Sequence, residues 1–192
     1  MAKVVETPPV KRTIWWNNRN KSILAWVVQI LLVLALSAVV AHFFFRTATM
    51  QEISMEPTIQ VNDQVRINRL SYVFGSPKRG DIIAFKKSDD ENASIHIKRV
   101  IGLPGDTVQI KDGMILINGE TYMESGEYPK VINPGLAEDP IKIGTGEYFV
   151  LGDNRNNSED SRFADMGNVL EENIIGKVWI TTSPFKRFGF IH

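Results

Sequence analysis

The sequence predicts a mainly β protein, with an antiparallel, partly closed β-domain joined to one N-terminal transmembrane helix. Two observations predict this architecture in the chain of 192 residues. One apolar stretch at 23–45 contains no Asp, Glu, Lys or Arg. The residues after it form short apolar runs separated by turn residues at close spacing, a pattern typical of strands. We therefore expect three parts: an N-terminal tail at 1–22, a helix at 23–45 and a β-rich domain at 46–192.

The apolar stretch is long enough to cross a membrane. Its 23 residues are interrupted only by the polar residues Gln29, Ser37 and His42. A helix of this length reaches about 34 Å, and the hydrocarbon core of a bilayer is about 30 Å thick. Two alternatives fit less well. A cleavable signal peptide has a shorter apolar region, and a buried globular helix is apolar along one stripe rather than on every face.

The distribution of charge predicts the orientation of this helix. Residues 1–21 carry five basic residues against Glu6, whereas only Arg46 follows the apolar stretch closely. Because basic flanking residues stay on the cytoplasmic side, we expect the tail in the cytoplasm and residues 46–192 outside, in a single-pass protein of the plasma membrane. The outer part carries 17 basic and 21 acidic residues, so nucleic acid is not an expected partner.

Seven strand candidates follow in chain order. They are residues 65–67, 81–85, 95–101, 107–110, 114–117, 147–151 and 174–181. Asp112-Gly113 predicts a hairpin between the fourth and fifth candidates. The polar region 119–146, which contains several prolines and glycines, predicts an irregular insertion, and residues 168–173 predict a short helix.

Three segments concentrate the residues suited to chemistry. They are Ser54-Met55-Glu56-Pro57-Thr58; Arg79 to Phe85 (RGDIIAF) followed by His96 to Asp106 (HIKRVIGLPGD); and Gly152 to Arg162 (GDNRNNSEDSR). In this order after an apolar helix, they resemble the bacterial type I signal peptidases in their compact Gram-positive form. The resemblance covers about residues 23–182.

This resemblance implies a function and a set of partners. Members of the family are membrane-bound endopeptidases that cleave signal peptides from exported preproteins after small residues, in the A-x-A pattern. They use a serine nucleophile with a lysine general base. The resemblance implies no cofactor and no metal. It implies that the partners are preprotein signal peptides and the lipid bilayer, at a place near the export translocon.

The residues themselves support this chemistry. The chain has no Cys, so a thiol nucleophile is excluded. A serine hydroxyl needs a base within hydrogen-bond reach, and a lysine serves when burial favours its neutral amine. Lys98 lies in the apolar run 95–101, where strand alternation places it on the face of His96 and opposite Arg99. We predict Ser54 as nucleophile and Lys98 as base. His96 is the alternative base, since a free histidine titrates near neutral pH.

The resemblance also assigns supporting residues. Ser158 is expected to hydrogen-bond the catalytic lysine and orient it. Asp160 and Arg162 are expected to form an ion pair nearby. Asp153, Arg155 and Arg99 are expected to add to the same network.

The resemblance also implies a set of substrate contacts. The resemblance assigns shallow apolar pockets for small substrate side chains to Met50, Met55, Ile59 and Ile97. It assigns the Ser54 backbone N–H as the oxyanion donor. Some relatives add a hydroxyl two residues before the nucleophile. Here that position is Glu52, which only accepts hydrogen bonds when ionised, so a second donor must come from elsewhere.

Three other functions fit the sequence less well. A catalytically silent membrane scaffold or regulator would be expected to lack Ser54 or Lys98, and both are present. A self-cleaving Ser/Lys repressor would carry a DNA-binding domain where the apolar helix lies. A metal site at Asp153, Glu159 and Asp160 would need more closely spaced oxygen ligands.

Overall fold

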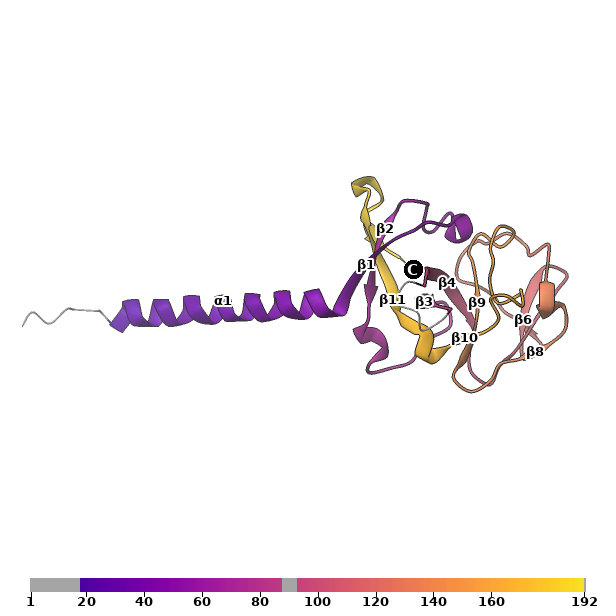
Figure 1. The fold of residues 1–192 in the computed structure, drawn as a ribbon, viewed down its shortest axis with the longest axis horizontal. Coiled ribbons are helices and arrows are strands. Elements are labelled where there is room, and N and C mark those ends of the chain that lie inside the picture. Colours follow the sequence, from indigo (N-terminus) through magenta and orange to yellow (C-terminus); the bar gives the residue numbers. More distant parts are fainter. Residues whose placement is uncertain (1–17, 88–92, 192) are drawn as a thin grey trace, which may run out of the picture. The chain divides into compact units, whose positions relative to one another are not determined.

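The computed structural model of the chain describes residues 18–87 and 93–191. The chain divides into two units, one ending at Ala41 and the other beginning at His42, and each is described by itself. Helix α1 runs from Asn18 to Phe44 (Figure 1). It begins before the expected residue 23 because a helical backbone continues through polar side chains as readily as through apolar ones.

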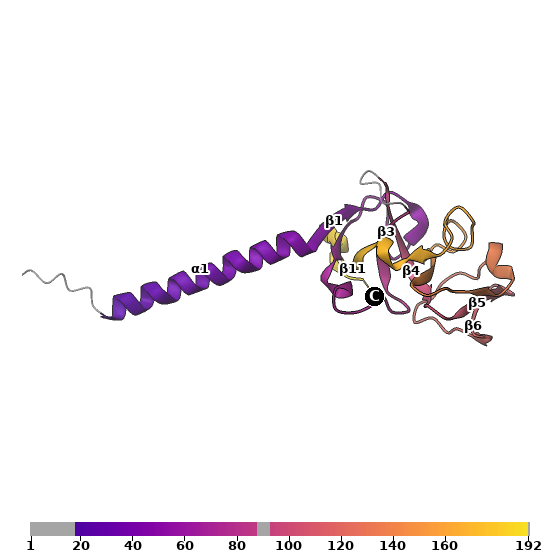
Figure 2. The same cartoon turned by 60° about the horizontal axis from the view of Figure 1, so that its bottom comes forward.

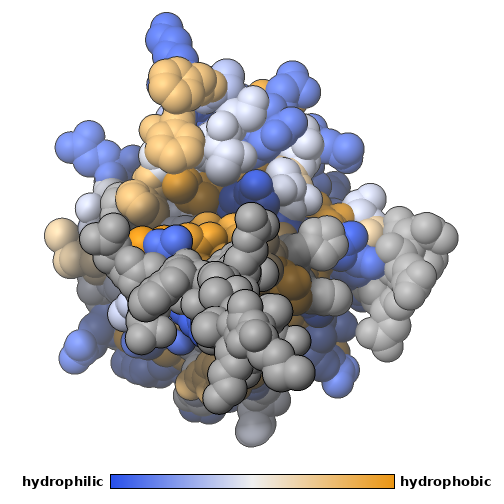
Figure 3. Space-filling model, turned by 90° about the vertical axis from the view of Figure 1, so that its left-hand side faces the viewer, coloured by the Kyte–Doolittle hydropathy of each residue, from blue (hydrophilic) through white to orange (hydrophobic). Residues whose placement is uncertain are grey.

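Helix α1 has the length and the composition that a membrane span requires. The segment Asn20–Ala41 has a mean hydropathy of 2.7, and none of it is buried. Apolar side chains on all faces of an isolated helix are unfavourable in water and favourable in lipid. Figure 3 shows one face of the molecule, on which exposed hydrophobic side chains lie among hydrophilic ones.

The larger sheet of the second unit is antiparallel and follows the order β1-β2-β11-β3-β4-β9-β10, with β12 paired to β11 (Figures 1 and 2). This order leaves β1 and β10 as its two edges, so the sheet is open rather than partly closed as expected. The strands are β1 Phe45–Thr49, β2 Gln64–Asn68, β3 Ile82–Lys86, β4 Ile95–Gly102, β9 Glu147–Leu151, β10 Val169–Leu170, β11 Ile174–Ser183 and β12 Gly189–Phe190.

The smaller sheet has the order β7-β6-β5-β8. Its central hairpin joins β5 Thr107–Lys111 to β6 Met114–Ile117 through Asp112 and Gly113, both with positive φ, as the sequence predicts. The region 119–146 is more regular than expected. It adds the edge strands β7 Glu120–Thr121 and β8 Ile141–Lys142 and the 3₁₀ turn Gly135–Glu138. It also buries three apolar side chains, those of Val131, Ala137 and Ile143.

All seven expected strands are present, and the differences lie in the shortest elements. Residues 168–173 form β10 and the 3₁₀ turn Glu171–Asn173 rather than one short helix. The unexpected strands β1, β7, β8, β10 and β12 have two to five residues each. The four two-residue strands are too short for alternation to be recognised, and each pairs with a longer neighbour. Strand β1 is as long as its partner β2, but its sequence FRTAT is mostly polar.

Strand β4 provides the frame of the site. It pairs with β3 along residues 95–99 and with β9 from Arg99 onward. Its apolar residues enter different core clusters, with Ile97 packed beside Met50 and Met55, and Val100 beside Phe85. This packing fixes the strand, so the polar side chains that alternate with its apolar ones are held in place.

Candidate active site

Ser54 lies in a short 3₁₀ turn, Ile53–Met55, that follows β1. Its side chain is 3% exposed. The backbone N–H of Ile59 donates to the Met55 carbonyl at 2.9 Å, and the backbone N–H of Asn154 donates to the Ser54 carbonyl at 3.0 Å. The second of these bonds ties the turn directly to the third sequence segment, about 100 residues away.

Lys98 is brought to Ser54 by strand β4. It stands opposite Ile83 of β3, and its side chain has no exposed surface. The Lys98 Nζ donates to Ser54 Oγ at 2.7 Å. The structure thus places in direct contact the two side chains that the sequence pointed to.

His96 shares the face of Lys98, as strand alternation predicts. Its Nδ1 lies 3.1 Å from Glu52 Oε1, whereas no hydrogen bond joins its ring to Ser54 within the described residues. The His42 side chain and His192 lie outside the described part of the chain. Of the two candidate bases, Lys98 has the geometry that a base needs.

Glu52 is the residue of this site whose role the sequence does not predict. Its Oε2 accepts hydrogen bonds from Lys98 Nζ at 2.8 Å and from Ser54 Oγ at 3.1 Å. The hydrogen bond from His96 lowers the pKa of Glu52 to about 2. Burial opposes this shift, and the hydrogen bond and charge of Lys98 add to it. The only signal in the sequence was its place two residues before the nucleophile.

Ser158 does not make the hydrogen bond expected of it. Its Oγ is buried and has no hydrogen-bond partner among the residues that the structure describes. The Lys98 amine is instead held by Glu52 and Ser54. The hydroxyl still lies beside the nucleophile turn, because a Cβ added to Gly152 would overlap both Ser158 Oγ and the Ser54 carbonyl.

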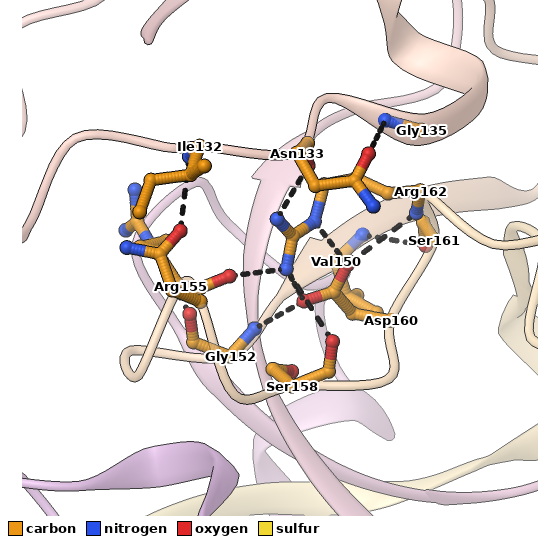
Figure 4. Close-up of polar contacts among 11 residues, drawn as sticks. Ile132, Asn133, Gly135, Val150, Gly152, Arg155, Ser158, Asp160, Ser161 and Arg162 are labelled. Atoms are coloured by element: carbon orange, nitrogen blue, oxygen red, sulfur yellow. Dashed lines mark hydrogen bonds and ion pairs between the residues drawn. The ribbon is translucent and has the colours of Figure 1, made fainter.

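Asp160 and Arg162 form the expected ion pair (Figure 4). The Arg162 guanidinium donates to Asp160 Oδ1 at 2.7 Å and to the backbone carbonyls of Arg155 and Asn133 at 2.6 and 2.9 Å. Asp160 Oδ2 in turn accepts from the backbone N–H of Gly152 at 3.1 Å. The pair is almost fully buried and holds the loop after β9 in one shape against the site.

Asp153 pairs with Arg99 rather than joining Arg155. Both carboxylate oxygens of Asp153 accept from the Arg99 guanidinium at 2.7 Å, and Thr58 Oγ1 donates to the same carboxylate at 2.5 Å. Burial by itself would lower the pKa of Arg99, but the hydrogen bonds and charge of Asp153 raise it above its ordinary value. This pair joins β4 to the loop after β9, and the hydrogen bond from Thr58 adds the segment that follows the nucleophile.

Arg155 instead pairs with Glu124 of the 119–146 region, at 2.5 and 2.6 Å. Tyr128 lies between two guanidinium groups, with its ring centroid 4.4 Å from Arg155 Cζ and 5.5 Å from Arg99 Cζ. The sequence did not indicate Glu124 or Tyr128, because nothing in a polar stretch marks which residue turns inward.

The four residues expected to line substrate pockets lie together, but inside the core. Their exposed fractions are 3% or less, and one cluster contains all four: Met50, Met55, Ile59 and Ile97. A cavity of about 290 Å³ opens beside the nucleophile, and these four are not among its lining residues. It is lined by Glu52, Ile53, Ser54, His96, Asn157 and Glu159.

The Asp153–Arg99 pair predicts a large effect on stability. Replacing Asp153 with alanine removes the carboxylate that pairs with the buried Arg99 guanidinium, so we expect the free energy of unfolding to fall by about 3–5 kcal/mol. Urea unfolding of the full chain in detergent measures this. The matched control is Asp165→Ala, which removes an exposed carboxylate and is expected to change stability by less than about 0.5 kcal/mol. Equal effects of both variants would contradict the prediction.

Comparison with known proteins gives one consistent family. The family described as signal peptidase, peptidase S26, matches residues 23–182. The signal peptidase I of Leptolyngbya laminosa is 36% identical, over 96% of this chain and 91% of that protein. The signal peptidase I T of Bacillus subtilis is 35% identical, over 91% of this chain and 90% of that protein.

A crystal structure of a signal peptidase I from Enterococcus faecalis is 32% identical and covers 53% of this chain and 96% of that one, with a TM-score of 0.41. The family match spans most of the chain, and the two sequence relatives are similar over nearly their whole lengths. This chain therefore belongs to the signal peptidase family, peptidase S26, and is a membrane-anchored serine endopeptidase that cleaves signal peptides.

Proposed function

We propose that Ser54 is the nucleophile and Lys98 the general base of this peptidase. The observation that carries the proposal is the 2.7 Å contact between Lys98 Nζ and Ser54 Oγ, two buried side chains that are 44 positions apart in the chain. The distance lies within the range that proton transfer needs. The Lys98 side chain has no exposed surface, so its amine is shielded from bulk water.

The reaction then follows from these positions. The neutral amine of Lys98 takes the hydroxyl proton of Ser54, and the oxygen attacks the scissile carbonyl. The backbone N–H of Ser54 stabilises the negative charge on the tetrahedral intermediate, as a donor that is already oriented. The lysine ammonium gives its proton to the leaving amine. The same lysine then activates a water molecule, which hydrolyses the acyl-enzyme.

The substrate adds as an extended strand beside residues 48–53 and 95–98. Two features of the sheet support this. Strand β4 pairs with β9 only from Arg99 onward, so residues 95–98 have no strand partner on that side within the described sheet. Strand β1 is an edge of the same sheet. Free backbone groups on such edges bind an extended peptide.

The substrate carries small residues at the first and third positions before the cut, in the A-x-A pattern. We place these side chains in the cavity beside Ser54 that Glu52, Ile53, Ser54, His96, Asn157 and Glu159 line. Met50, Met55, Ile59 and Ile97 belong to one buried core cluster, and we propose that they support the substrate site from within the core.

The catalytic domain lies on the outer face of the plasma membrane, with the N-terminus in the cytoplasm and the export translocon nearby. The basic residues before α1 support this orientation.

Enzyme and preprotein are then confined to one membrane, which raises their effective concentration without further contacts. A cysteine introduced at Glu120 should react with a membrane-impermeant maleimide on intact cells. If the cysteine reacts only after lysis, the catalytic domain lies in the cytoplasm and the proposed orientation is wrong.

The function is tested with one labelled preprotein that has alanine at the first and third positions before its cleavage site. We expect the full chain in detergent to cut it once, after the first of these positions. Replacing that alanine with leucine should lower kcat/KM by roughly 100-fold, because the scissile carbonyl can no longer reach its position. Cutting at several sites, or equal rates on both substrates, would contradict the proposed specificity.

A further inference from the structure

The carboxylate of Glu52 contacts both residues of the proposed dyad at once. One oxygen, Oε2, accepts from Lys98 Nζ at 2.8 Å and from Ser54 Oγ at 3.1 Å. The other, Oε1, lies 3.1 Å from His96 Nδ1. The Glu52 side chain is 41% exposed, whereas that of Lys98 is fully buried. The carboxylate thus stands between the buried amine and the cleft.

This contact has an electrostatic consequence for the reaction. A carboxylate that accepts a hydrogen bond from an amine stabilises its ammonium form, and an ammonium cannot take a proton from serine. The hydrogen bond from His96 lowers the pKa of Glu52 to about 2; burial opposes this shift, and Lys98 adds to it. Glu52 therefore stays ionised at neutral pH, and its contact with the amine persists. The amine becomes a base only when the carboxylate moves away.

A second, independent observation is a buried hydroxyl without a partner near the nucleophile turn. Ser158 Oγ is buried and makes no hydrogen bond with any described residue. It packs over Gly152, close to the Ser54 carbonyl. A buried hydroxyl without a partner is unfavourable, so Ser158 Oγ offers an unsatisfied acceptor to an amine released by Glu52.

We propose that Glu52 is a positioning residue that restrains Lys98 as an ammonium in the substrate-free enzyme and is displaced when a preprotein strand enters the cleft. The cleft is lined by Glu52 itself together with Ser54 and His96, so a bound strand takes the space of the carboxylate. The ammonium then gives one proton to solvent and Lys98 turns to Ser158 Oγ. The proposal rests on the proposed roles of Ser54 and Lys98.

The other charged groups around Lys98 do not duplicate this restraint. On the same strand, His96 contacts the far oxygen of Glu52, and Arg99 is paired with Asp153. Strand β3 presents the apolar Ile83 opposite Lys98. Glu159 lines the same cleft but is exposed and forms no ion pair within the described residues.

The test is the pH profile of kcat/KM for cleavage of one labelled preprotein, from pH 5 to 9, with the full chain in detergent. In Glu52→Gln, a neutral side chain of the same shape, we expect the acid limb of the profile to move to lower pH. The rate at pH 6 should then rise roughly threefold or more above wild type. Glu52→Ala should move the limb in the same direction. The control Glu120→Gln removes the same charge from an exposed edge strand and should leave the profile in place.

The outcomes separate this inference from the proposed dyad. An unmoved profile in both Glu52 variants would overturn the restraint, and so would a uniform loss of rate at every pH in folded protein, which a merely structural role produces. Lys98→Met is measured alongside. If that variant keeps its activity, the proposed dyad itself fails, whatever the Glu52 variants show.

Discussion

Replacing Ser54 with alanine, or Lys98 with methionine, should abolish signal-peptide cleavage, with kcat/KM at least about 1,000-fold below wild type in each case. Alanine removes the only atom that attacks the carbonyl. Methionine keeps the length of the lysine side chain and removes its amine, and the buried site around Lys98 accepts an uncharged chain. Cleavage of a labelled preprotein by the full chain in detergent measures both losses.

Two further variants make this result specific. Because the two side chains act as one unit, the double variant Ser54→Ala with Lys98→Met should be no slower than either single one. The exposed Lys111→Met removes an amine of the same kind elsewhere and should retain wild-type activity. Cleavage by either single variant at more than a tenth of the wild-type rate would reject the dyad.

Replacing Gly152 with alanine should lower kcat/KM by roughly 100-fold, although Gly152 has no chemistry of its own. The new Cβ would overlap Ser158 Oγ and the carbonyl of Ser54. The carbonyl is backbone and can yield only if the nucleophile turn moves. A displacement of about 1 Å in a catalytic group is sufficient for a loss of this size.

The measurement is again preprotein cleavage, combined with thermal unfolding to show that the variant is folded. Gly189→Ala is the matched control, since nothing lies within 4 Å of a Cβ at that position. It should change neither quantity. Full activity of Gly152→Ala would mean that the turn around Ser54 tolerates movement, against the packing described above.

Local patterns were sufficient for the apolar helix and the longer strands, and extended motifs pointed to the proposed central pair. Uninterrupted apolar residues predict α1, and alternation within 95–101 places Lys98 beside His96 and away from Arg99. These features depend on neighbours in the chain, so they are visible without coordinates. Ser54 and Lys98 were recognisable because both belong to extended motifs, which carry more information than either residue type alone.

Long-range packing decided the rest. Glu52 meets Lys98 and His96 across more than 40 positions, and Arg155 meets Glu124 across 31. Such partners depend on strand order and on the path of the loop after β9, which no local pattern encodes. Ser158 shows the same limit, because its motif predicts a bond to the lysine, whereas in the structure the lysine bonds to Glu52 and Ser54. A motif thus predicts which side chains gather at a site, while the geometry of the folded chain selects which of them bond.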